Sequence, residues 1–377
     1  MKYRIKRSIV RKLIYILLVA AIVYLLVVLF RAMVPEPPFR EIEQARVAIA
    51  AARDHNSGIY SPKIFREARS YYDSAMISWR SENKRFILFR DYEKARTFAA
   101  IANKKAIEAT RTTIAKSNSL KASLESEIKR LKGEIASFEK IFQSMPIPQD
   151  IRKKHASGKL LLKEAEIDFN NENFVSGNVK ITEANEYISN AYSLARKKLE
   201  DYFKSYPDWQ ELATGAITDS RRTGSYTIVI EKIPPRLHLY KGGKKKYTFE
   251  VEFGSNWMGD KKSRGDMATP EGNYKITKKL SNGSTKYHKA LLINYPNKQD
   301  VEEFSTMVKR GQIPSDSRIG DLIEIHGGGG RGGNWTQGCV ALKNSDMDQL
   351  YKYVSIGTPV TIIGSISTLG EFLSPGK

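Results

Sequence analysis

The sequence contains a single cysteine, Cys339, so no disulfide can form within the chain. It contains only five histidines, and the residues that could bind zinc include no close-spaced pair of the kind that zinc sites use. These residues are His238, His288, His326 and Cys339. The glycine-rich run 327–333 precedes a cysteine turn rather than a helix, which argues against a dinucleotide site. We therefore predict that the protein uses neither a metal ion nor an organic cofactor.

Acidic residues are too few to balance the basic ones, and the formal net charge is +21. The sequence has no zinc-finger spacing and no aromatic motif of the RNP type, so the charge alone does not indicate nucleic-acid binding. Attraction to an anionic membrane surface or to an acidic wall polymer explains it equally well. We therefore expect no nucleic-acid partner.

Charged residues are absent from the apolar run 13–30 near the N-terminus. As a helix this run would rise about 27 Å, close to the roughly 30 Å thickness of a bilayer core. It is preceded by Lys2, Arg4, Lys6, Arg7, Arg11 and Lys12. Such basic residues stay in the cytoplasm, and Ala32-Met33-Val34 makes a poor cleavage site. We predict that residues 1–34 are a basic tail and an uncleaved single-pass anchor in the cytoplasmic (inner) membrane, with residues 35–377 periplasmic or otherwise extracytoplasmic.

Glycine is scarce between residues 41 and 206, where Ala, Glu, Lys and Ser dominate. Two rows of residues, mostly alanine, repeat at alternating intervals of four and three positions, which places each row on one face of a helix. Each row is called a seam below. They are Ala95, Ala99, Ala102, Ala106 and Ala109, and then Ala184, Ile188, Ala191 and Ala195. We predict that residues 35–213 form two related helical hairpins, joined by a break at Met145-Pro146-Ile147-Pro148.

The role of this helical module is left open by its sequence. It could be a spacer, a platform for a protein partner or an oligomerisation coil, or simply a stalk with solvated charged faces. A short coiled coil is conceivable at residues 121–140, although the segment spans few heptads.

Glycine, proline, aromatic and β-branched residues become frequent after residue 214. Alternating patterns and turn residues predict strands there. The expected strands are 226–230, 236–240, 247–253, 273–277, 322–326 and 359–363, with a hairpin turn at 241–244. We predict a mostly β domain over residues 214–377. The expected fold class is therefore α+β multidomain, with a transmembrane helix, an all-α module and a C-terminal β-rich domain.

The residues with catalytic potential are a histidine at the end of a predicted strand, His326, and Cys339 in a glycine-containing turn. A thiolate is a strong nucleophile, and a nearby imidazole can deprotonate the thiol and later protonate a leaving amine. Gly338 leaves room for backbone N–H groups of the turn to face a developing oxyanion. A histidine and a cysteine at this spacing are also compatible with simple packing.

Four ordered segments resemble the L,D-transpeptidase (YkuD-type) catalytic domain. They are Ala268-Thr269-Pro270-Glu271-Gly272-Asn273-Tyr274, Leu291-Leu292-Ile293-Asn294-Tyr295-Pro296-Asn297, Ile325-His326-Gly327 and Thr336-Gln337-Gly338-Cys339. The resemblance covers residues 226–364 and says nothing about residues 35–215. It implies a β-rich catalytic fold that acts on stem peptides of peptidoglycan. The acyl group of the third, diamino acid residue passes to the cysteine as D-alanine leaves, and then to an amine or to water.

Residue by residue, the resemblance gives Cys339 the role of nucleophile and His326 the role of proton donor and acceptor. It implies that the Gly327 carbonyl orients the imidazole of His326. It also implies that Gly338 belongs to the turn that binds the oxyanion. Gln337 stands where the family often has histidine, and Ala341 where it often has arginine. We expect the following residues to contribute to substrate binding: Gln337, Thr336, Trp335, Arg331 and His288.

Three functions remain compatible with this sequence. The first is a cysteine acyltransferase of the cell wall, acting on peptidoglycan through a Cys339 thioester. The second is a hydrolase of stem-peptide bonds, either an L,D-carboxypeptidase or an amidase. The third is a non-catalytic protein that binds the wall or a protein partner through its helices. Retention of both His326 and Cys339 favours the first.

Overall fold

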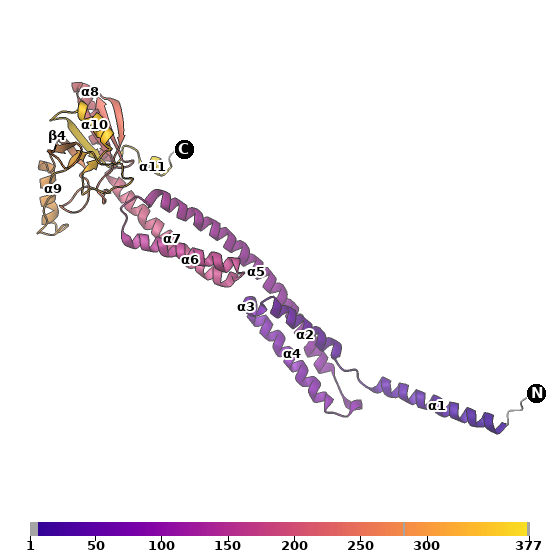
Figure 1. Cartoon of the computed structure of the whole chain (residues 1–377). Coiled ribbons are helices and arrows are strands. Elements are labelled where there is room, and N and C mark those ends of the chain that lie inside the picture. Colours follow the sequence, from indigo (N-terminus) through magenta and orange to yellow (C-terminus); the bar gives the residue numbers. More distant parts are fainter. Residues whose placement is uncertain (1–6, 282, 375–377) are drawn as a thin grey trace, which may run out of the picture. The chain divides into compact units, whose positions relative to one another are not determined.

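The computed structural model describes residues 7–281 and 283–374 (Figure 1). The chain divides into two compact units, residues 1–127 with 167–178 and residues 128–166 with 179–377. The basic residues Lys2, Arg4 and Lys6 lie outside the described residues.

Helix α1, Arg7–Met33, contains the apolar run predicted to span the membrane. Its segment Ile9–Met33 is long and apolar enough to cross a bilayer, and none of its most apolar window is buried against the protein. A helix that is hydrophobic on all sides has no polar face to turn toward water.

The remaining helices of the first unit form a hairpin with an additional helix packed on it. Its elements are α2 (Phe39–Asp54), α3 (Ser57–Tyr60), α4 (Pro62–Asn83), η1 (Ile87–Phe89) and the first part of α5 (Glu93–Phe142). The five alanines of the first seam are buried to 1% exposure or less, as expected of a packing seam. Alanine lets the helices approach closely, so the hydroxyl of Ser61 reaches the carbonyl of Ala109 at 3.0 Å.

Most of a second hairpin belongs to the other unit, whereas its residues 167–178 belong to the first. It is built from the end of α5, α6 (Gln149–Asn170) and α7 (Phe174–Tyr202), followed by η2 (Phe203–Ser205) and α8 (Tyr206–Thr223). The predicted break at residues 145–148 separates α5 from α6, and the second seam is buried. Close approach requires Gly158, because a Cβ there would lie 2.6 Å from Ile188 Cγ1. Residues 121–140 are part of the continuous helix α5, and the coiled-coil interpretation gains no support.

An eight-stranded sheet forms the C-terminal part, in the order β3-β2-β1-β8-β4-β5-β6-β7. The strands are β1 (Tyr226–Glu231), β2 (Arg236–Lys241), β3 (Lys244–Glu250), β4 (Gly272–Leu280), β5 (Ala290–Ile293), β6 (Glu324–His326), β7 (Val340–Ala341) and β8 (Pro359–Ile363). The pairs β1–β8 and β6–β7 are parallel, and the others are antiparallel. Beyond β3, Glu252 forms an antiparallel bridge with Ala341 of β7, so the two edges of the sheet meet.

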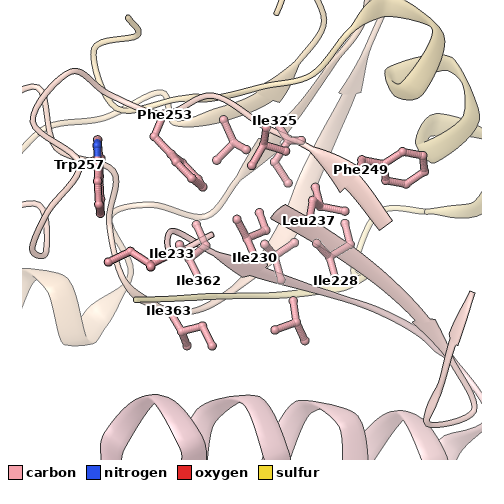
Figure 2. Close-up of a cluster of buried hydrophobic side chains, with 14 of the residues drawn as sticks. Ile228, Ile230, Ile233, Leu237, Phe249, Phe253, Trp257, Ile325, Ile362 and Ile363 are labelled. Atoms are coloured by element: carbon pink, nitrogen blue, oxygen red, sulfur yellow. The ribbon is translucent and has the colours of Figure 1, made fainter. Parts of the chain in front are cut away.

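The hydrophobic core of this part occupies both faces of the strands and includes Trp209 and Ala213 of helix α8 (Figure 2). Ile228, Ile230 and Ile362 project from neighbouring strands into it. Trp209 of α8 is 2% exposed and packs so closely on Gly364 that a Cβ there would lie 2.2 Å from the indole ring. Helix α8 therefore contributes to the core of the sheet.

The predicted fold class is confirmed, with helices first and a sheet-rich part after them. The predicted domain boundary between residues 213 and 214 falls within α8, and the three predicted domains remain predictions. Of the six predicted strands only 359–363 has the observed ends, as β8, and the other five differ at one end or both. β3 runs from Lys244 to Glu250 because Gly242 and Gly243 alone make the turn, and β6 begins at Glu324 because Leu322 has a φ of 55°. The sequence analysis did not predict the helices α9 (Lys298–Lys309), α10 (Asn344–Tyr353) and α11 (Leu369–Leu373).

Candidate active site

The parallel pairing of β6 and β7 brings the predicted catalytic residues together. Ile325 lies opposite Val340, and His326 lies opposite Ala341. Cys339 immediately precedes β7 and therefore lies next to Glu324, whose backbone N–H points at Cys339 Sγ at 3.4 Å. Since side chains alternate along a strand, Glu324 and His326 share one face of the sheet with Cys339.

His326 is completely buried, and the hydrogen bond of one ring nitrogen fixes its tautomer. Its Nδ1 lies 2.6 Å from the carbonyl oxygen of Gly327, the contact that the sequence analysis assigned to Gly327. A carbonyl only accepts hydrogen bonds, so Nδ1 carries the proton and the lone pair is on Nε2. Within the described residues Nε2 is buried without a hydrogen-bond partner. An imidazole held this way presents a free basic nitrogen.

The environment of His326 keeps the ring neutral. Burial lowers the pKa of His326 to about 4, and the positive charges of Lys286 and Arg331 act in the same direction, against the Gly327 hydrogen bond. The ring of Tyr287 stacks on the imidazole with a centroid distance of 3.5 Å and an interplanar angle of 8°. At neutral pH His326 is therefore an uncharged base, covered on one face by an aromatic ring.

Cys339 rests as a neutral thiol in this structure. Burial raises the pKa of Cys339, and the Glu324 carboxylate adds to the effect, whereas the Glu324 N–H and the charges of Lys286 and Lys261 oppose it. Its Sγ lies 3.7 Å from the carbonyl oxygen of Leu322. In the part of the chain that the structure describes, no hydrogen bond joins Cys339 to His326. The resting pair therefore consists of a thiol and a free imidazole.

The turn before Cys339 is held by Thr336. Its Oγ1 donates to the carbonyl of Cys339 at 2.7 Å and accepts from the N–H of Gly338 at 3.2 Å. Gly338 has a φ of 124°, and a Cβ there would lie 2.6 Å from the carbonyl oxygen of Ala268. Only glycine fits this position. The N–H group predicted to face an oxyanion is thus engaged by Thr336 in the resting state.

A cleft of about 650 Å³ opens onto Cys339. Trp335, Thr336 and Gln337, which the sequence analysis selected, are among the residues that line it. The cleft also contains cations that the sequence analysis missed: Arg264, Lys286 and Lys261. The Lys261 ammonium is bound to Asp266 at 2.7 Å, whereas the Arg264 guanidinium has no hydrogen-bond or ion-pair partner among the described residues.

Two of the predicted substrate-binding residues are engaged elsewhere. The Arg331 guanidinium stacks on the Trp335 ring at 3.5 Å and is not among the residues that line the cleft. His288 Nε2 lies 2.8 Å from Asp348 Oδ1 in α10. Arg264 and Lys286 line the cleft beside Cys339, whereas Arg331 and His288 are not among its lining residues.

Glu252 holds Trp335, one of the residues that line the cleft, through a hydrogen bond. Its two carboxylate oxygens accept hydrogen bonds from Trp335 Nε1 at 2.7 Å and from the N–H of Gly332 at 2.8 Å. The rings of Trp335 and His326 form a T-shaped pair with a centroid distance of 6.1 Å and an interplanar angle of 70°. Sequence reasoning had no signal for Glu252 or Tyr287, because both reach the site through long-range contacts. Across the described ranges, no group of three or more His, Cys, Asp or Glu residues is arranged to hold a metal ion.

Residues 225–362 match the YkuD family, described as the L,D-transpeptidase catalytic domain, and this confirms the resemblance seen in the sequence. No curated protein was found to match the chain.

Among solved structures, the Bdellovibrio bacteriovorus protein Bd1075 is similar over 40% of this chain and 53% of that chain, with 23% identity and a TM-score of 0.30. An L,D-transpeptidase from Stackebrandtia nassauensis is similar over 37% of this chain and 56% of that chain, with 20% identity and a TM-score of 0.25. An L,D-transpeptidase from Mycobacterium tuberculosis H37Rv is similar over 37% and 57% of the two chains, with 15% identity and a TM-score of 0.25. The match spans little more than half the length of these three chains.

Proposed function

We propose that this chain, whose residues 225–362 match the L,D-transpeptidase catalytic domain, is a peptidoglycan acyltransferase with Cys339 as its nucleophile. The observation that carries the proposal is the Nε2 of His326, which has no hydrogen-bond partner in the described part of the chain. A buried nitrogen without a partner is costly, and it is placed on the same sheet face as the only thiol of the chain, beside an open cleft.

In the first half of the reaction, Cys339 Sγ attacks the carbonyl carbon of the diamino acid residue of a donor stem peptide. His326 Nε2 takes the thiol proton, the C–S bond forms, and the C–N bond to D-alanine breaks. The same imidazolium returns the proton to the leaving amine. Attack requires Cys339 Sγ to turn from the carbonyl of Leu322 toward the imidazole, which supplies the contact that the resting site lacks.

In the second half, an amine of another stem peptide attacks the thioester. Its proton passes to His326, the C–S bond breaks, and the thiol is restored by that proton. The oxyanion of each step would draw the Gly338 N–H away from Thr336 Oγ1. We assign the carboxylates of the stem peptides to Arg264 and Lys286, the cleft cations that Asp266 does not hold.

The apolar helix α1 sets the proposed location. We assign it to the cytoplasmic membrane through residues 13–30, with residues 35–377 on the side of the wall, where peptidoglycan is found. The helices between anchor and sheet act as a spacer or as a platform for a protein partner. Protease added to intact spheroplasts should then digest the C-terminal part, and its protection would contradict this topology.

Product analysis tests the proposed reaction. Full-length protein in detergent is incubated with tetrapeptide-bearing muropeptides, and the products are separated and weighed by mass spectrometry. A transpeptidase gives cross-linked dimers that lack one D-alanine per cross-link, whereas a hydrolase gives shortened monomers without dimers. Unchanged muropeptides, with a folded protein, would instead favour the non-catalytic alternative.

A further inference from the structure

The loop at one end of the first unit presents two aromatic side chains to solvent. This loop, residues 84–92, connects α4 to α5 and is called the hairpin tip below (Figure 1). Phe86 is 65% exposed and Phe89 is 69% exposed, with ring centroids 5.8 Å apart. Exposed neighbouring aromatic rings with no role in the core often mark a binding surface.

The conformation of the hairpin tip is fixed by hydrogen bonds within the loop and to the end of α4. Arg90 donates to the carbonyl oxygens of Asn83 and Arg85, both at 3.1 Å. The Tyr92 hydroxyl donates to Asn83 Oδ1 at 2.7 Å, and the N–H of Asp91 donates to Glu82 at 2.9 Å. These bonds fix the loop in a conformation that holds both phenylalanine rings outward.

The hairpin tip lies at the end of the unit where the membrane helix leaves. Arg96, early in α5, donates to the carbonyl of Glu36 at 2.7 Å, and Glu36 follows the end of α1 at Met33 by three residues. Three residues span about 11 Å at most. The start of α2 is at the same end, since the Phe39 ring meets the Trp79 ring near the end of α4 at 5.0 Å. A bilayer that contains α1 is therefore close to the hairpin tip.

The charge around the hairpin tip suits a membrane surface. Residues 80–96 contain six basic and three acidic residues, a net charge of +3. Glu82, one of the acidic residues, is paired with Arg85 at 2.9 Å. Lys84 and Arg80 are exposed and have no ion-pair partner within the described residues. Basic residues are attracted to the surface of an anionic bilayer, and aromatic rings favour the interface.

We propose that the hairpin tip is a membrane-docking site, in which Phe86 and Phe89 enter the interface of the bilayer that holds α1 and the surrounding cations meet anionic headgroups. This inference rests on the proposed membrane anchor. The tether makes docking intramolecular, so even weak insertion is effective. Docking would fix the direction in which the helices leave the membrane.

A pair of matched fluorescent labels tests this docking. Cys339 is the only cysteine, so Cys339→Ser removes the native thiol from the full-length chain. A single new cysteine is then introduced for labelling, either by Ser81→Cys, beside the hairpin tip, or by Ser119→Cys. Ser119 is 26 residues beyond Glu93 in α5, about 39 Å along the helix. Each protein carries an NBD label and is reconstituted into vesicles with or without phosphatidylglycerol and with lipids doxyl-labelled near the headgroup.

We expect the label at position 81 to lose most of its fluorescence to the doxyl lipids, and the label at 119 to lose almost none. Phe86→Ser with Phe89→Ser should abolish the loss at 81, whereas Ile107→Ser with Ile114→Ser, at exposed apolar positions of α5, should preserve it. Equal quenching at 81 and 119, or quenching at 81 that survives the phenylalanine substitutions, would overturn the docking site. Failure of the chain to float with vesicles would overturn the anchor and the docking site with it, and muropeptide turnover in detergent is independent of both.

Discussion

Two buried histidines of the same sheet differ in how many of their ring nitrogens form hydrogen bonds. His238 in β2 is 2% exposed, and both of its ring nitrogens have partners, Thr248 at 2.9 Å and Glu231 at 2.8 Å. His326 in β6 is 0% exposed, yet among the described residues only its Nδ1 has a partner. A fully bonded buried histidine stabilises a fold, whereas one with a free nitrogen retains a site for a proton.

A third histidine shows that a free nitrogen alone does not mark an active site. His155 Nε2 in α6 is also buried without a partner among the described residues, and burial lowers its pKa. Its ring stacks on Phe138 at 3.9 Å, and the chain's only thiol is elsewhere. The combination of free nitrogen, neighbouring thiol and cleft distinguishes His326.

The largest effect is expected from the nucleophile. Cys339→Ala should reduce turnover of muropeptides to background, because no other thiol exists in the chain. Cys339→Ser should come close to this, since a serine hydroxyl is a much weaker nucleophile without stronger activation. Thermal unfolding of both variants, measured by circular dichroism, should resemble that of the wild type.

The two histidines provide a direct test of the comparison. His326→Ala should lower kcat/KM by about 10²- to 10⁴-fold, the usual value of a positioned acid–base group. His238→Ala should leave turnover nearly intact but cost about 1–3 kcal/mol of unfolding free energy, because Glu231 loses a buried partner. If His238→Ala abolished turnover in a folded protein, or His326→Ala did not reduce it, the assignment of roles would be wrong.

Gln337 stands in the cleft where the family often has histidine, and its effect should be smaller. Gln337→Ala should lower kcat/KM by about 10- to 1000-fold at most, since the side chain supplies at best one auxiliary hydrogen bond to the oxyanion. The comparison with His326→Ala is made on the same muropeptide, and a loss larger than that of His326→Ala would contradict this order.

The pH dependence should distinguish His326 from an ordinary histidine. Burial disfavours the charged imidazolium and lowers the pKa of His326 to about 4, so the base remains neutral as the pH falls from 7 to 5. We expect kcat/KM to change little over this range and to fall as the pH approaches 4. A half-maximal loss near pH 6.5 would show that His326 is not buried in this way during turnover.

The sequence predicted features that depend on neighbouring residues in the chain. The apolar run before Arg31 is a continuous hydrophobic stretch, and the buried alanine seams and the alternating strands have local periodicity. His326 and Cys339 were recognisable because each lies in a short motif.

Features that depend on distant segments were not recognisable. Tyr287 reaches His326 from the loop between β4 and β5, and Glu252 reaches Trp335 across the closure of the sheet. Arg331 was expected to bind substrate, but nothing local indicated that it would stack on Trp335. Trp209 likewise belongs to the core of the sheet, although its helix lies before the first strand in the sequence.

The intermediate itself provides the most direct test of the account. Full-length protein is mixed with a tetrapeptide-bearing muropeptide, quenched in acid within the first turnover, and its intact mass is measured before peptide mapping. We predict a mass increase equal to the donor minus D-alanine, located on Cys339, stable in acid, released by hydroxylamine, and absent from Cys339→Ala. An adduct on another residue, or full turnover by Cys339→Ala, would contradict the cysteine mechanism.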